Sequence, residues 1–220
     1  AREYRSIHSE NIKYSGVESE YFCEHKILEV KKIVFKPGIR FLDFGCGDGT
    51  TAKYFAKYFP EGFYQGIDIS GESIKQACQQ DLNRCLFTHF DGQTIPFDNE
   101  SFDVIMVANV FHHIEKKKHI QILSEMSRVL AMNGELIIFE HNPINPITQW
   151  IVNTCAFDKD AELLRPKHFK SCFSQTGYSL LITKYLLFFP RLSIFKRLIM
   201  LEDHFGNIPF GAQYLVVGQK

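Results

Sequence analysis

The sequence predicts an α/β fold in which helices cover both faces of a mostly parallel sheet. Between residues 40 and 140, short apolar segments alternate with amphipathic ones, as strands and helices do in such sheets. The segment Phe102–Ala108 is almost continuously apolar, as expected of a strand buried on both faces. Polar residues stand where four predicted strands end, and parallel strands bring these ends to one edge of the sheet. These residues are Asp68, Asp91, Asn109 and Glu140.

The first part of the chain predicts a regular alternation of elements. An apolar face near helical period predicts a helix within a lead-in at residues 1–36, and Pro37 and Gly38 end it. Strands are predicted at Arg40–Phe44, Phe63–Ile67, Cys85–Phe90, Phe102–Ala108 and Leu136–Glu140. Helices are predicted at Thr50–Phe59, Ser70–Gln80 and Lys116–Leu130, the last followed by Asn133 and Gly134, which tolerate a left-handed backbone.

The pattern changes after Glu140. Pro143 and Pro146 exclude regular structure between residues 141 and 146. Residues 141–165 are therefore predicted to form a lid-like insertion over the sheet. The elements predicted beyond residue 146 are helices at Ile147–Thr154 and Lys159–Thr176 and strands at Tyr178–Phe189 and Ala212–Gly218.

Length and composition indicate one folded domain over residues 1–220. The chain has 220 residues, of which 45% are hydrophobic and 23% charged, so general disorder is not expected. Its 21 Phe and 9 Tyr residues can fill a core, line an apolar pocket, or both. The formal net charge is +0, which argues against a nucleic-acid partner, although a local basic patch stays open.

Cysteine usage and the lack of long apolar runs suggest a cytoplasmic location. The six cysteines form no CxxC pair and have no histidine at zinc-ligand spacing, so reduced thiols and no metal site are expected. The first thirty residues are polar and charged, unlike a signal peptide. No apolar run reaches the ~18 residues that a spanning helix needs. Peripheral membrane contact stays open, and the sequence does not predict the oligomeric state.

A glycine-rich loop after the first predicted strand, Gly45-Cys46-Gly47-Asp48-Gly49, favours a ligand that approaches the backbone closely. A phosphate loop would end in Gly-Lys-Ser/Thr, and a dinucleotide loop would read GxGxxG, whereas this loop reads GxGxG. S-adenosylmethionine (SAM) fits better, because the carboxylate of Asp43 can accept a hydrogen bond from an ammonium and would repel a pyrophosphate. An ordinary tight turn is the remaining interpretation.

Together, these motifs resemble the class I SAM-dependent methyltransferases, and most closely their small-molecule branch. The resemblance covers roughly residues 40–140. It implies a Rossmann-like three-layer sandwich with a mostly parallel seven-stranded sheet and an antiparallel C-terminal strand. It also implies SAM as cofactor and S-adenosylhomocysteine as product. The cofactor-binding residues that it implies are Asp43, Gly45, Cys46, Gly47, Asp68, Ile69, Asp91, Gly92 and Asn109.

The residue chemistry agrees with a nucleoside ligand. Asp68 can accept hydrogen bonds from both ribose hydroxyls, and Asp91 suits an exocyclic amine. Asp68 stands nineteen residues after Gly49, close to the ~20-residue spacing of the ribose acid in nucleotide sites. Alternatives are that Asp68 caps the next helix, a role that Ser70 can fill, and that Asp91 merely forms a turn.

Methyl transfer from a sulfonium is an in-line displacement, so alignment and desolvation can supply most of the acceleration. A base is needed only where the acceptor must lose a proton. The candidate bases near the strand ends are His112, His113, Glu140 and His141. The doubled histidine equally fits a role in packing beneath the pocket or in capping the next helix.

The chain favours a small-molecule acceptor methylated on O, N or C. It lacks the Asn/Asp-Pro-Pro-aromatic motif after the fourth strand and has no Pro-Cys pair, both of which mark nucleic-acid methyltransferases of this fold. The apolar segment Leu180–Pro190 makes an apolar, aromatic or lipid-like acceptor a candidate. Alternatives are a protein or nucleic-acid methyltransferase, a catalytically silent SAM-binding partner subunit, and an NAD-type oxidoreductase.

Overall fold

The computed structural model describes residues 19–155, 161–189 and 196–220. Much of the predicted N-terminal lead-in and the middle of the predicted lid, residues 156–160, therefore lie outside the described residues.

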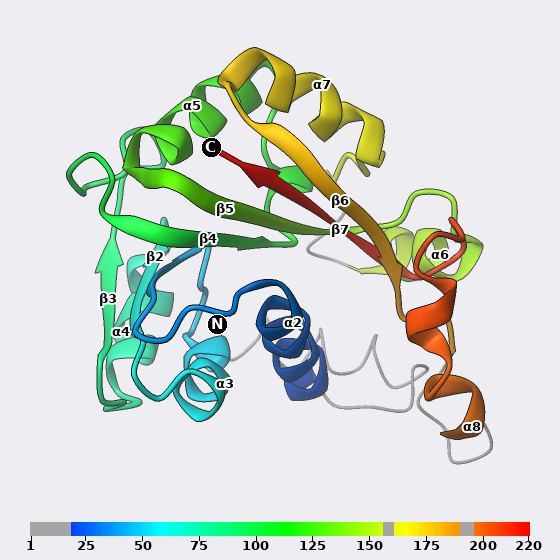
Figure 1. The fold of residues 1–220 in the computed structure, drawn as a ribbon, viewed down its shortest axis with the longest axis horizontal. Coiled ribbons are helices and arrows are strands. Elements are labelled where there is room, and N and C mark those ends of the chain that lie inside the picture. The colour runs from blue at the N-terminus through cyan, green and yellow to red at the C-terminus, as the bar shows by residue number, and fades with distance from the viewer. Residues whose placement is uncertain (1–18, 156–160, 190–195) are drawn as a thin grey trace.

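A seven-stranded sheet forms the middle layer, with strand order β3-β2-β1-β4-β5-β7-β6 (Figure 1). The strands are β1 (Arg40–Phe44), β2 (Phe63–Asp68), β3 (Cys85–His89), β4 (Phe102–Ala108), β5 (Leu130–His141), β6 (Ser179–Leu186) and β7 (Gln213–Gln219). The first five run parallel, and β7 pairs antiparallel with both β5 and β6. The predicted mostly parallel sheet with an antiparallel C-terminal strand is confirmed.

Helices cover both faces of the sheet (Figure 1). One core cluster joins the sheet to α5 and α7, and the other joins it to α2 and α3, which gives the three layers expected. The helices are α2 (Ser19–Ile33), α3 (Thr50–Tyr58), α4 (Gly71–Cys78), α5 (His119–Val129), α6 (Pro146–Thr154), α7 (Pro166–Thr176) and α8 (Lys196–Ile199). The 3-10 turns are η2 (Phe111–His113), η3 (Lys116–Lys118) and η5 (Glu202–Phe205).

The predicted boundaries agree with the structure to within three residues, except two that are wrong by six or seven residues. The helix predicted to reach Leu130 ends at Val129, and β5 begins at Leu130 because that residue pairs with Phe102 across the sheet. Asn133 has the expected left-handed backbone, with a φ of 61°, but lies within β5. The helix predicted from Lys159 begins at Pro166, because proline lacks an N–H and suits the first helical position.

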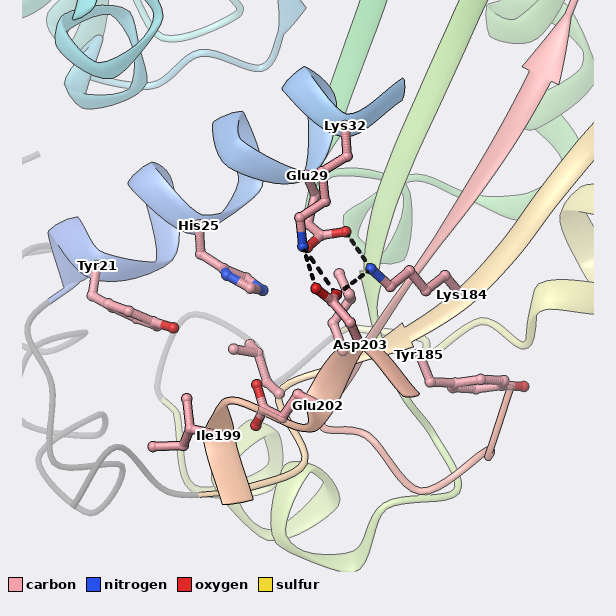
Figure 2. Close-up of a pocket in the computed structure, with 11 residues that line it drawn as sticks. Tyr21, His25, Glu29, Lys32, Lys184, Tyr185, Ile199, Glu202 and Asp203 are labelled. Atoms are coloured by element: carbon pink, nitrogen blue, oxygen red, sulfur yellow. Dashed lines mark hydrogen bonds and ion pairs between the residues drawn. The ribbon is translucent and has the colours of Figure 1, made fainter. Parts of the chain in front are cut away.

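Helix α2 is tied to β6 and η5 by four charged side chains, which we call the α2–β6 charge cluster (Figure 2). The Lys32 ammonium lies 2.7 Å from Glu29 and 2.9 Å from Asp203. The Lys184 ammonium lies 2.8 Å from each of the same two carboxylates. These contacts line a cavity of about 210 Å³ and hold α2 against the sheet.

The start of α6 is tied to the segment that leads into β7. The buried Asn142 amide donates to the carbonyl oxygens of Pro209 (3.0 Å) and Gly211 (2.8 Å). Asn145 Nδ2 donates to Phe210 O (2.7 Å), and Thr148 Oγ1 donates to Ala212 O (2.9 Å). We call this set of four hydrogen bonds the α6 anchor.

Two further findings concern the whole described chain. No disulfide joins any of the six cysteines, all of which lie in described residues. None of the described helices has the length and apolar character needed to cross a bilayer.

Candidate functional site

The glycine loop follows β1 and presents its backbone at the carboxyl edge of the sheet. Gly45, Gly47 and Gly49 all have positive φ angles, of 79°, 54° and 77°. A Cβ built on Gly45 would lie 2.5 Å from Val110, so the fold itself requires glycine there. A Cβ on Gly47 would meet no protein atom within 4 Å, so this residue borders open space.

Asp43, two residues before the loop, is buried at the end of β1. Its Oδ2 accepts a hydrogen bond of 2.5 Å from the Tyr64 hydroxyl. Burial raises the pKa of Asp43 to about 7, despite the opposing effect of that hydrogen bond. A cation that reaches this carboxyl group therefore stabilises its ionised form and lowers its pKa.

Asp68, at the end of β2, holds the glycine loop in place. Its Oδ2 accepts a hydrogen bond of 2.9 Å from Gly47 N, and its Oδ1 accepts one of 2.8 Å from Ser70 N. Ser70 itself is the N-cap of α4, as the sequence predicts. The next side chain, Ile69, is exposed although it is large and apolar.

Asp91 and Gly92 form a turn after β3. Oδ1 of Asp91 accepts hydrogen bonds from Gln93 N (2.8 Å) and Thr94 N (3.0 Å), and these bonds lower the pKa of Asp91. Gly92 has a φ of 79°, and a Cβ there would lie 3.2 Å from Ile69, so the turns after β2 and β3 adjoin. Asp91 thus forms a turn, which was the alternative role that the sequence allowed. Its carboxylate nevertheless remains exposed at the same edge.

Asn109 follows β4, between the ends of β1 and β5. Its backbone has a φ of 57°, and its N–H donates to Phe139 O at 2.9 Å. Its side-chain Oδ1 is buried and has no hydrogen-bond partner among the described residues. A buried acceptor in this state is rare in folded proteins and points to a donor that a ligand supplies.

The four candidate bases lie together at the ends of β4 and β5. Glu140 is 0% exposed and His112 is 2% exposed. The carboxylate of Glu140 accepts hydrogen bonds from Phe111 N (2.8 Å) and from His112 Nδ1 (2.6 Å). The rings of His113 and His141 lie 4.1 and 5.2 Å from that of His112. His113 is exposed and His141 half-buried, so these two are the candidates with access to an acceptor.

Known proteins resemble this chain both in sequence and in fold. A family model described as "Methyltransferase domain" matches residues 41–134, which include all nine cofactor-binding candidates. A crystal structure of a SAM-dependent methyltransferase from Archaeoglobus fulgidus superimposes with a TM-score of 0.69, covering 92% of this chain and 95% of that one at 16% identity. Residues 41–134 of this chain match the methyltransferase domain model, and the chain has the fold of a known SAM-dependent methyltransferase.

Proteins that match part of this chain include enzymes named for lipid substrates. A phthiotriol/phenolphthiotriol dimycocerosates methyltransferase from Mycobacterium leprae is 33% identical over 121 residues, which are 53% of this chain and 43% of that protein. A fatty-acid O-methyltransferase from Mycolicibacterium smegmatis is 30% identical over 115 residues, or 51% and 41% of the two chains. The matched region covers less than half the length of these two relatives.

The residues at the sheet edge fit SAM. The space beside Gly47 accepts a ligand at van der Waals contact with the backbone, and Asn109 Oδ1 requires a donor. Asp43, Asp68 and Asp91 stand at the ends of three neighbouring strands, β1, β2 and β3, on the same edge as that space. Sequence reasoning did not single out Tyr64 or Lys26, which lie close to Asp43; an aromatic residue in a strand and a lysine in an amphipathic helix carry no functional signal by themselves.

Proposed function

We propose that the protein transfers a methyl group from SAM to a small-molecule acceptor with apolar or lipid-like character. The observation that carries the proposal is the clamped glycine loop, in which Asp68 holds the backbone of Gly47 beside open space. When bound, SAM supplies an activated methyl group on a sulfonium. The residues proposed to bind it are Asp43, Gly45, Cys46, Gly47, Asp68, Ile69, Asp91, Gly92 and Asn109.

In this proposal the residues of the chain orient the reactants and exclude water. The carboxylate of Asp68 positions the loop, and the buried pair of Glu140 and His112 fixes the turn that carries His113. His113 and His141 are then the residues that take a proton from an acceptor that must lose one. An acceptor that is already an anion needs no such base.

Exposed apolar side chains near the same edge support a lipid-like acceptor. Ile144 lies just before α6, and Ile147 and Trp150 lie within it; the three are spaced three residues apart and are all exposed. The hydrogen bond from Asn145 to Phe210 O places the exposed Phe210 beside them. Apolar surface of this kind fits an acyl chain or the surface of a membrane. The names of the two relatives agree with such an acceptor.

We also propose that the described parts of the predicted lid, residues 141–155 and 161–165, cover the acceptor side of the cleft. Glu162 N donates to His112 O at 2.9 Å, and Tyr214 Oη donates to Leu164 O at 2.7 Å, so the segment returns to the histidine turn. Trp150 is the one tryptophan of the sequence and is 50% exposed. Its fluorescence should change when S-adenosylhomocysteine and then an acceptor bind. Constant emission at saturation with both ligands would contradict the proposal that this segment is a lid.

Isothermal titration with S-adenosylhomocysteine and with NAD tests the cofactor. We expect binding of the first and none of the second. A screen with methyl-labelled SAM then compares long-chain fatty acids, phenolic lipids, a peptide mixture and RNA as acceptors. Label in a lipid product supports the proposal, and label in peptide or RNA overturns the acceptor class. Tight cofactor binding without transfer to any acceptor would favour the silent partner subunit.

A cytoplasmic location stays part of the proposal, since cysteines without disulfides fit a reducing compartment.

A further inference from the structure

Lys26, on α2, is a buried cation that the proposed chemistry does not yet use. Its side chain is 8% exposed, and it makes no hydrogen bond or ion pair with any described residue. Lys32, six residues later on the same helix, has two carboxylate partners in the α2–β6 charge cluster. Burial of an ammonium without a partner is costly, and burial lowers the pKa of Lys26. Lys26 also lies outside the region that the methyltransferase family matches.

The neighbours of Lys26 place its ammonium over the cofactor edge. The carboxylates of Asp43, at the end of β1, and Glu140, at the end of β5, both act on it electrostatically. Strand β4 lies between β1 and β5, so a charge within reach of both carboxylates lies over the end of β4. That position is occupied in the sheet by Asn109, whose side-chain oxygen has no partner among the described residues.

A second contact fixes this face of α2 against the glycine loop. The Cys23 thiol, one turn before Lys26, lies beside the Thr51 hydroxyl in the first turn of α3. At the other end of α2, the charge cluster holds Glu29 and Lys32 against β6 and η5 (Figure 2). With both ends held, Lys26 is presented to the loop by a rigid element.

Neither nearby carboxylate is available as a full partner. Glu140 already accepts hydrogen bonds from Phe111 N and His112 Nδ1. Asp43 accepts a hydrogen bond from Tyr64, and its raised pKa, about 7, leaves it only partly charged at neutral pH. Neither carboxylate is therefore a full counter-ion for the Lys26 ammonium.

We propose that Lys26 binds the α-carboxylate of SAM, while Asp43 faces the α-ammonium of the same group. The proposal rests on the proposed function and extends it, because it assigns the two charges of the amino-acid zwitterion to two residues of opposite sign. Asp43 lies on a strand inside the matched domain, whereas Lys26 comes from a helix that precedes that domain.

A pair of ligands tests this assignment. S-Adenosylhomocysteine carries the carboxylate, and 5′-methylthioadenosine has the same nucleoside and sulfur but lacks the amino-acid group. Lys26→Met should weaken binding of the first by roughly 10- to 100-fold, the scale of a hydrogen bond between charged groups. It should leave the affinity for the second unchanged. Lys26→Arg should restore part of the affinity for S-adenosylhomocysteine.

Lys31→Met is the matched control, because Lys31 is exposed on the same helix and should affect neither ligand. An equal loss for both ligands with Lys26→Met, or no loss for either, would overturn the assignment and make Lys26 a structural residue. Retained binding of 5′-methylthioadenosine also shows that the variant is folded. If the unaltered protein binds neither ligand, the proposed function fails together with this inference.

Discussion

The two halves of the sheet edge hold their acidic residues in different ways. In the half formed by β1 to β3, Asp68 and Asp91 accept hydrogen bonds from backbone N–H groups of nearby loops and keep carboxylate surface at the edge. In the half formed by β4 and β5, Glu140 is fully buried and satisfied by the turn before His113. The first half is thus prepared to contact a ligand, and the buried pair in the second half positions other groups.

The largest effect is expected in the first half, from Gly47→Val. A side chain at this position would fill the open space beside the loop, so binding of S-adenosylhomocysteine should be abolished in isothermal titration. Gly177→Val is the matched control, since Gly177 also has a positive φ, of 81°, and open space around it, but ends α7. Both variants should lose about 1–2 kcal/mol of stability. Normal cofactor binding by Gly47→Val would remove the loop from the site.

Substitutions in the second half should affect turnover rather than cofactor binding. His113→Ala should slow methylation of a hydroxyl acceptor by roughly 100-fold, the usual contribution of a general base, and leave the affinity for S-adenosylhomocysteine unchanged. A carboxylate acceptor needs no base and should be methylated at the normal rate. His112→Ala should instead lower the melting temperature, because it removes one of the two hydrogen bonds to the buried Glu140 carboxylate. Equal slowing with both acceptors would argue that His113 is not a base.

Asp68→Ala should weaken S-adenosylhomocysteine binding by about 1.5–3 kcal/mol, or roughly 10- to 150-fold, the range for hydrogen bonds to a charged group. Part of this loss comes from the freed Gly47 backbone. As a control, Asp103→Asn removes a carboxylate that pairs with Arg40 and Lys36 at the start of β1 and β4. It should lower stability without changing affinity. Unchanged affinity in a folded Asp68→Ala protein would refute the ribose assignment.

The smallest effect is a pH dependence of a few fold. The pKa of Asp43 is raised to about 7, so the carboxyl group becomes protonated as pH falls through that value and loses its attraction for an ammonium. Affinity for S-adenosylhomocysteine should therefore rise as the pH increases from about 6 to 8 and then level off. The affinity of Asp43→Asn should be lower and flat over this range. A profile that is identical in both proteins would exclude Asp43 as the titrating group.

The same contrast explains which features the sequence could predict. The contacts of Asp68 and Asp91 join residues 2, 3 or 21 positions apart, within or between adjacent motifs, so motif spacing was sufficient to place both acids at one edge. The parallel strand order followed from the alternation of strands and helices.

Long-range contacts were beyond such reasoning. The link between Glu140 and His112 spans 28 positions, and its burial depends on how β5 packs beside the turn after β4. The sequence could name these residues as candidates but not separate the buried pair from the accessible His113. Lys26 depends on the docking of α2, and no local pattern distinguishes it from the other lysines of that helix.

The α6 anchor also limits how the molecule can move. Four hydrogen bonds tie residues 142–148 to residues 209–212, immediately before a strand that is paired on both sides within the sheet. Displacing the beginning of α6 would require breaking these bonds together or disturbing the sheet. The beginning of α6 therefore keeps its position relative to the sheet. Any hinge in the segment must lie beyond Thr148. The backbone N–H groups of residues 142–148, which exclude Pro143 and Pro146, should then exchange with solvent almost as slowly as those of β7, with or without ligand.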